Sequence, residues 1–105
     1  MSDAKLVVEA GVCRFTTTIH ATSEDGMTVL LNIETGCPNV KNLAENMKEA
    51  DAMDAVYSKM PENHVLMKCY EFIPHPACPI PCAVVKACEV ACDLALKREV
   101  SFKFV

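Results

Sequence analysis

Most prolines of this chain fall within one short stretch, which constrains the fold more than any other feature of the sequence. These prolines are Pro74, Pro76, Pro79 and Pro81. Proline lacks a backbone N–H and fixes its own φ angle, so the stretch can form neither a helix interior nor a central strand. Because proline is tolerated in the first turn of a helix, a new helix is predicted to begin near Pro81. The apolar face of residues 84–95 predicts that this helix continues to about Lys97.

The N-terminal part of the chain predicts a β-hairpin. Residues 5–22 are rich in Val, Thr, Ile and Phe, which favour extended structure, and Gly11 indicates a bend or bulge just before Cys13. Residues 23–26 are a turn signal, and the sequence MTVLLNIET then predicts a second strand. Apolar residues alternate with threonine over residues 15–19, as in a strand with one buried face.

Helical spacing dominates the middle of the chain. Apolar residues from Val40 onward predict a helix that begins at Pro38, has a break near Asp51 and ends before Pro61. Residues 61–72 predict another short helix, although a strand fits the same pattern. The C-terminal sequence VSFKFV alternates apolar and polar residues and predicts a strand that joins the hairpin.

Together these elements predict a single α+β domain over residues 1–105, in the order β-β-α-α-α-β. The hairpin and the C-terminal strand are expected to form a small antiparallel or mixed sheet, with two or three helices packed on one face. There is no apolar run near the ~18 residues of a membrane span and no signal-peptide pattern, so we expect a cytoplasmic protein with no membrane partner. The net charge of −4 argues against nucleic-acid binding.

Seven cysteines are a high and odd number for a chain of this size. In a reducing compartment, metal binding or redox chemistry is a commoner use of thiols than disulfide formation. Three of the cysteines lie in regular apolar segments and are expected to pack in the core as small hydrophobic residues. These are Cys69, Cys88 and Cys92.

The other four cysteines lie where regular backbone structure is predicted to break, and we treat them as candidate ligands. They are Cys13, Cys37, Cys78 and Cys82. Positive charge at a helix N-terminus favours a thiolate, the form that binds metals, and Cys37 and Cys82 lie at predicted helix starts. Cys-Pro occurs at Cys37 and Cys78, as at the end of the bacterial ferredoxin motif. His75, three residues before Cys78, is a further candidate ligand or proton donor, or an exposed loop residue.

Three segments, AGVCRFTTTI, GCPNVKNLAE and HPACPIPCAVVKACEVACDLAL, resemble a family of small uncharacterised single-domain proteins found mostly in anaerobic archaea and bacteria. The resemblance covers nearly the full chain and points to Cys13, Cys37 and Cys78 as the family's marks. It implies that glycine is typical after the first of these cysteines, where this chain has Arg14. The resemblance implies no activity for this chain.

The leading hypothesis is a metal–thiolate protein that binds an iron–sulfur cluster, with [4Fe–4S] or zinc as the candidate centres. Soft thiolate ligands favour both over magnesium or calcium. Such a protein would act in electron transfer or cluster handling and meet a redox or cluster-transfer protein. One alternative is a thiol-based redox enzyme or sulfur carrier, with Cys78 or Cys82 as nucleophile and His75 nearby. Another is an interaction domain with core cysteines, whose C-terminal strand forms a homodimer.

Overall fold

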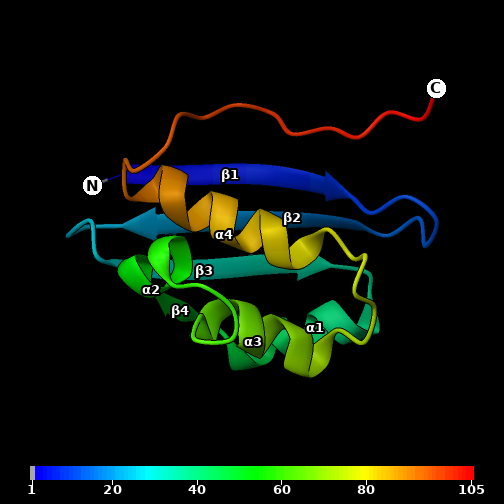
Figure 1. The fold of residues 1–105 in the computed structure, drawn as a ribbon, viewed down its shortest axis with the longest axis horizontal. Coiled ribbons are helices and arrows are strands. Elements are labelled where there is room, and N and C mark those ends of the chain that lie inside the picture. Colours follow the sequence, from blue (N-terminus) through cyan, green and yellow to red (C-terminus); the bar gives the residue numbers. More distant parts are fainter. Residues whose placement is uncertain (1) are drawn as a thin grey trace.

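Alternating apolar residues build an antiparallel sheet of four strands in the order β1-β2-β3-β4 (Figure 1). The computed structural model describes residues 2–105. The strands are β1 (Ser2–Glu9), β2 (Thr16–Ser23), β3 (Thr28–Thr35) and β4 (Glu49–Asp51). Every other residue of β2 is buried from Thr17 to Ser23, which places one face of the sheet under the helices. The α+β class is therefore confirmed, and the sheet is purely antiparallel.

The predicted bend at Gly11 is a complete chain reversal, so the first extended segment divides into β1 and β2. Gly11 and Arg14 both have positive φ angles, of 88° and 60°, and the Arg14 N–H donates to the Gly11 carbonyl at 2.9 Å. Glycine enters this left-handed region without a steric penalty, which lets the chain turn sharply here. The hairpin predicted between β2 and β3 is confirmed, with Ile19 paired to Ile33.

The helices are α1 (Pro38–Asn46), α2 (Ala52–Tyr57), α3 (His64–Phe72) and α4 (Ile80–Ala91). The predicted break near Asp51 is confirmed, but the intervening chain is a strand, β4, where a helix was predicted up to the break. The Leu31 N–H donates to the Lys48 carbonyl at 2.8 Å, so pairing with β3 draws these residues out of the helix. Asp51 then caps α2 by accepting the Met53 N–H at 3.0 Å.

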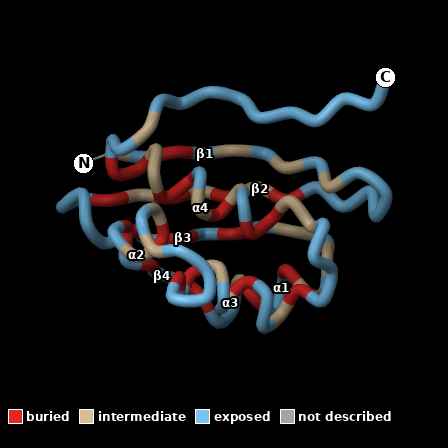
Figure 2. Tube along the Cα trace, viewed as in Figure 1, coloured by how far each residue is buried: buried red, intermediate tan, exposed pale blue. Residues whose placement is uncertain are grey.

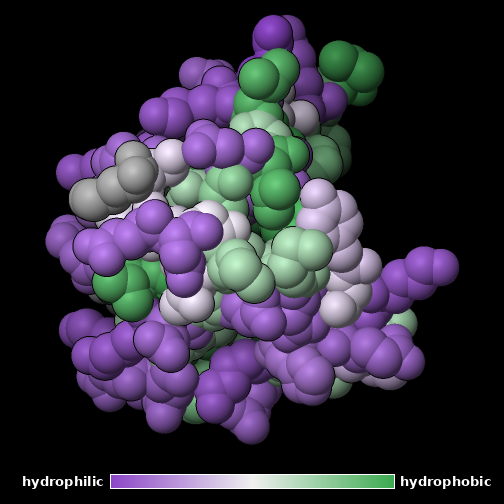
Figure 3. Space-filling model, turned by 90° about the vertical axis from the view of Figure 1, so that its left-hand side faces the viewer, coloured by the Kyte–Doolittle hydropathy of each residue, from purple (hydrophilic) through white to green (hydrophobic). Residues whose placement is uncertain are grey.

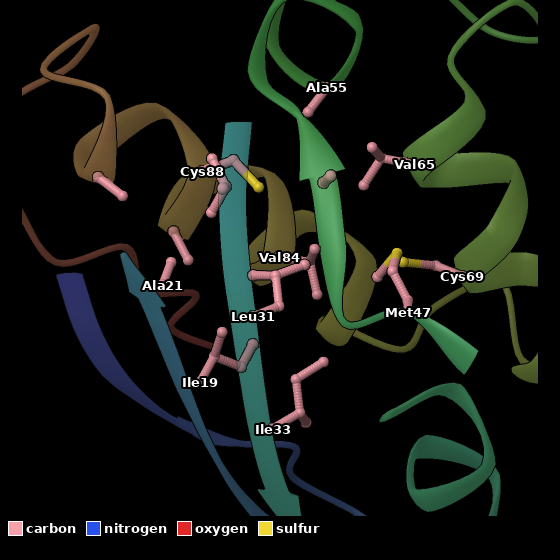
Figure 4. Packing of buried hydrophobic residues seen from close by; sticks show 14 of the residues in the cluster. Ile19, Ala21, Leu31, Ile33, Met47, Ala55, Val65, Cys69, Val84 and Cys88 are labelled. Atoms are coloured by element: carbon pink, nitrogen blue, oxygen red, sulfur yellow. The ribbon is translucent and has the colours of Figure 1, made fainter. Parts of the chain in front are cut away.

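The core lies between the sheet and the helices, as the buried segments in Figure 2 show. Ile19, Leu43 and Val84 from β2, α1 and α4 are fully buried there. Figure 4 places Cys69 and Cys88 among these apolar side chains, with Met47 and Cys69 pointing toward each other. Among residues 2–105, none of the helices combines the length and apolar character needed to cross a lipid bilayer.

The C-terminal part of the chain differs from the prediction in two ways. The last helix ends at Ala91 rather than near Lys97, because the chain reverses at Asp93, whose φ angle is 59°. The predicted C-terminal strand is absent: residues 95–105 have no regular secondary structure, and residues 96–105 are exposed. A strand needs a hydrogen-bonded neighbour, and the alternating pattern of this segment finds none within the described chain.

Candidate thiolate site

Strand register brings two of the candidate cysteine segments to the same end of the sheet. Glu9 pairs with Thr16, and Thr17 pairs with Thr35, so the turn 10–15 and the residues after β3 leave the sheet together. A side chain at Gly36 would lie 3.2 Å from the Phe15 ring, so the two segments are in close contact. The segments that carry Cys13 and Cys37 are thus neighbours because of the register, although they are far apart in sequence.

Cys37 lies at the N-cap of α1, as predicted, and is half-buried against the core. Its N–H donates to the Thr35 hydroxyl at 3.1 Å, and that hydroxyl lies 2.7 Å from the hydroxyl of the buried Thr17. Pro38 occupies the first turn of the helix, where its missing N–H is not needed. The backbone is therefore fixed on both sides of the Cys37 side chain.

Cys78 reaches the same end of the sheet from the proline-rich segment, because α4 starts there and runs back over β1 and β2 (Figure 1). The Cys78 N–H donates to the His75 carbonyl at 3.2 Å, which closes a turn just before α4. The Cys78 side chain is half-buried and packs against the same core as Cys37. The prolines thus position Cys78 by holding the chain in a tight turn between α3 and α4.

The electrostatics of Cys78 link the three cysteines. Burial raises the pKa of the Cys78 thiol, a hydrogen bond from the Ile80 N–H lowers it, and the negative charges of Cys37 and Cys13 raise it further. A charge effect of this kind requires the sulfur atoms to be near one another. The fold therefore places Cys37 and Cys13 within electrostatic range of Cys78.

The three thiols lie at one end of the sheet, but they are not arranged as metal ligands. Among residues 2–105, no group of three or more histidine, cysteine, aspartate or glutamate side chains is arranged to hold a metal ion. The charge effect at Cys78 and the lack of ligand geometry are compatible, because charges act over longer distances than a metal–sulfur bond of about 2.3 Å. The three thiols share one end of the sheet, and Cys13 lies exposed in a turn.

The two other predicted site residues lie differently. Cys82, in the first turn of α4, is exposed and lines an apolar groove of about 400 Å³ between α3 and α4, with Leu66 and Tyr70 among its neighbours. It is not among the groups that perturb the pKa of Cys78. His75 is exposed, and its carbonyl rather than its ring contacts Cys78.

The three cysteines predicted to be core residues are confirmed as such. Cys69 and Cys88 are completely buried, and Cys92 is buried as well. Burial raises the pKa of both Cys69 and Cys88 to about 12, so they stay protonated at neutral pH. The charge of Cys78 adds to the shift at Cys69, so this core thiol lies within electrostatic range of Cys78.

Sequence reasoning missed the two threonines that support Cys37. Thr17 and Thr35 look like ordinary strand residues, since threonine is common in strands. The only signal is the position of Thr35 two residues before Cys37, the spacing of a hydroxyl-to-backbone turn. The contribution of Thr17 depends on strand register, which a single sequence does not determine.

Comparison with known protein families places the chain in one of them. A family model described as a family of unknown function, DUF6951, matches residues 4–104. No curated protein and no solved structure matches the chain. The matched range includes every cysteine discussed above.

Proposed function

The chain belongs to this family of unknown function, DUF6951, whose description supplies no activity, and we propose from the residues of the chain that it is a metal–thiolate protein. Cys13, Cys37 and Cys78 hold an iron–sulfur cluster, or zinc in its place, at one end of the sheet. The observation that carries the proposal is that the turn 10–15, the N-terminus of α1 and the turn before α4 lie at the same end of the sheet, with Cys37 and Cys78 packed against one core.

The ligand chemistry fits a soft metal. Three sulfur donors from separate loops favour iron–sulfur or zinc centres over hard cations, which prefer oxygen. Both Cys37 and Cys78 precede a helix of more than two turns, and the Ile80 N–H at the start of α4 donates to the Cys78 sulfur. Binding would require the exposed Cys13 turn to move toward the two half-buried thiols.

The raised pKa of Cys78 argues against this thiol as a nucleophile. At neutral pH the thiol stays protonated, and a protonated thiol is a poor nucleophile. A metal cation competes directly with that proton, and its binding releases the proton to solvent. Metal binding at Cys78 should therefore become stronger as the pH rises.

Anoxic purification with analysis of iron, acid-labile sulfide and zinc tests this proposal. Iron with matching sulfide is expected for a cluster, and zinc alone for the alternative centre. Cys78→Ser should lose most of the bound metal, whereas Cys92→Ala, which removes a thiol from the far end of α4, should retain it. A metal-free wild-type protein that takes up neither iron and sulfide nor zinc on reconstitution would refute it.

Cys82 supports a second candidate function, a thiol enzyme or sulfur carrier. It is exposed at the start of α4 and opens onto the apolar groove beside Tyr70 and Lys86, where a small apolar substrate has room to bind. This candidate predicts that Cys82 reacts with iodoacetamide faster at pH 7 than the other exposed thiol, Cys13. Equal rates at the two cysteines would count against it.

A further inference from the structure

The C-terminal segment, residues 99–105, has the pattern of a strand but no partner. Val100, Phe102 and Phe104 alternate with the polar Ser101 and Lys103. Phe102 is 86% exposed and Phe104 is fully exposed. Within the described chain, residues 95–105 form no hydrogen bond and no ion pair. Two exposed phenylalanines on an unpaired, extended backbone indicate a missing binding partner.

The sheet has an unpaired edge of matching length. In the order β1-β2-β3-β4, β1 pairs only with β2, so its outer side presents free N–H and C=O groups. β1 contains eight residues, about 26 Å at 3.3 Å per residue, and residues 99–105 extend over about 23 Å. An edge of this length is a ready template for another strand.

The faces of the two segments also match. On β1, Leu6 and Val8 are half-buried toward the helices, while Lys5, Val7 and Glu9 face solvent. A strand paired with β1 would place Val100, Phe102 and Phe104 beside the half-buried face, and Ser101 and Lys103 beside the solvent-facing one. The alternation of apolar and polar residues therefore continues across the sheet edge.

Helix α4 provides further apolar surface above that edge. Ala83 and Val90 lie seven residues apart, so they share one flank of the helix, and both are only partly buried. Val85 lies on the opposite flank and faces α3 across the groove. Figure 3 shows hydrophobic residues next to hydrophilic ones at the top of the molecule, where the C-terminal segment lies in Figure 1.

We propose that residues 99–105 form a fifth strand on the β1 edge of a second copy of this chain, in a reciprocal two-fold dimer. Each copy gives one strand and accepts one, so a single symmetric arrangement satisfies both unpaired features. A buried phenylalanine contributes about 150–250 Å², so four of them with the surfaces they cover reach the roughly 1,200–2,000 Å² of a stable interface.

The C-terminal segment starts next to its own β1 but does not pair with it. The Ser2 hydroxyl donates to the Asp93 carboxylate at 2.7 Å, so the segment starts beside the first residues of β1. In the view of Figure 1 it follows β1 along its outer edge, but no backbone hydrogen bond joins the two. In the dimer each copy's segment would leave the side of its own β1 and pair with the β1 edge of the other copy.

Light scattering after size-exclusion chromatography tests the dimer with a matched pair of variants. The wild type and Ser101→Lys should have twice the mass of the 11.5 kDa chain, because position 101 faces solvent in the paired strand. Phe102→Lys introduces the same charge on the apolar face and should give a monomer. Truncation after Arg98 should give a monomer as well. A monomeric wild type, or a dimer that survives both changes, would overturn the proposal.

Hydrogen exchange distinguishes a second copy from pairing within one chain. Amides of residues 99–105 and of β1 should be protected together, and dilution to the monomer should remove that protection. Protection that persists in the monomer would show that the segment pairs with its own β1. This measurement does not depend on metal content, so its outcome is separate from that of the thiolate site.

Discussion

The hydroxyl groups of Thr17 and Thr35 lie 2.7 Å apart across the β2–β3 pair, at the point where the sheet meets the thiolate site. Thr17 is 1% exposed, so its hydroxyl depends on this contact for a hydrogen bond. The Thr35 oxygen also accepts the Cys37 N–H at 3.1 Å. The Thr35 hydroxyl therefore links the β2–β3 pair to the backbone of Cys37, a candidate ligand.

Replacing Thr35 with valine should destabilise the fold and loosen Cys37. The change leaves the Thr17 hydroxyl and the Cys37 N–H without partners, and an unsatisfied buried polar group costs about 1–3 kcal/mol. Urea unfolding of Thr35→Val should show a loss in that range, with lower metal content in the anoxic protein. Thr18→Val, on the open face of the sheet, is the control and should change neither quantity. Equal effects of the two variants would contradict the role of Thr35.

Replacing Arg14 with glycine should stabilise the protein. The Arg14 φ angle is 60°, in the left-handed region that costs a residue with a Cβ atom about 1–2 kcal/mol relative to glycine. We expect Arg14→Gly to raise the free energy of unfolding by about 1 kcal/mol and Arg14→Ala to leave it nearly unchanged. Thermal unfolding of both variants provides the measurement. The loss of a long side chain next to Cys13 should also speed alkylation of that thiol.

These residues illustrate what the sequence could predict. The Gly-Cys37-Pro and Ala-Cys78-Pro junctions were identifiable because glycine and proline have strong local effects on the backbone. The N-terminal hairpin and the buried cysteines followed from local periodicity and neighbours. The convergence of Cys13, Cys37 and Cys78 was an expectation only, because strand register and helix packing involve residues far apart in the chain.

Two errors have the same physical origin. Glu49–Asp51 follows a helical pattern, but it pairs with β3, and tertiary contacts override local propensity. The C-terminal residues follow a strand pattern, but a strand forms only when a neighbouring edge is available. In both cases the local sequence pattern is present, but the presence or absence of a pairing strand determines the secondary structure.

Replacing Asn63 with leucine should cost more than any of the surface changes. Asn63 is 1% exposed, and its amide donates to the Ala55 and Ser58 carbonyls at 2.9 and 3.0 Å. Its side-chain oxygen caps α3 by accepting the Leu66 N–H at 3.0 Å. Losing this network leaves buried groups unpaired, and we expect a loss of about 3 kcal/mol. Chemical denaturation provides the measurement, with the exposed Asn32→Leu as control. A loss no larger than that of the control would show that water replaces the network.

Alkaline pH should destabilise the fold through its buried thiols. Burial raises the pKa of Cys69 and Cys88 to about 12, whereas a thiol in the unfolded chain has a pKa of about 8.5. Below pH 8.5 both states are protonated, so the stabilising contribution is complete. Between about pH 9 and pH 12 the unfolded chain loses protons that the folded chain keeps. Each thiol then lowers the free energy of unfolding by up to about 1.4 kcal/mol per pH unit.

The comparison of variants isolates this effect from the titration of lysine and tyrosine. Cys69→Ala should be less stable than the wild type at pH 7, because it leaves a cavity in the core. The difference in the free energy of unfolding should then narrow as the pH rises from 8 to 10.5, since only the wild type retains the thiol. Urea unfolding in the presence of a phosphine reductant measures it. Cys82→Ala, at an exposed position, should keep a constant difference. A constant difference for Cys69→Ala would show that its thiol ionises alike in both states.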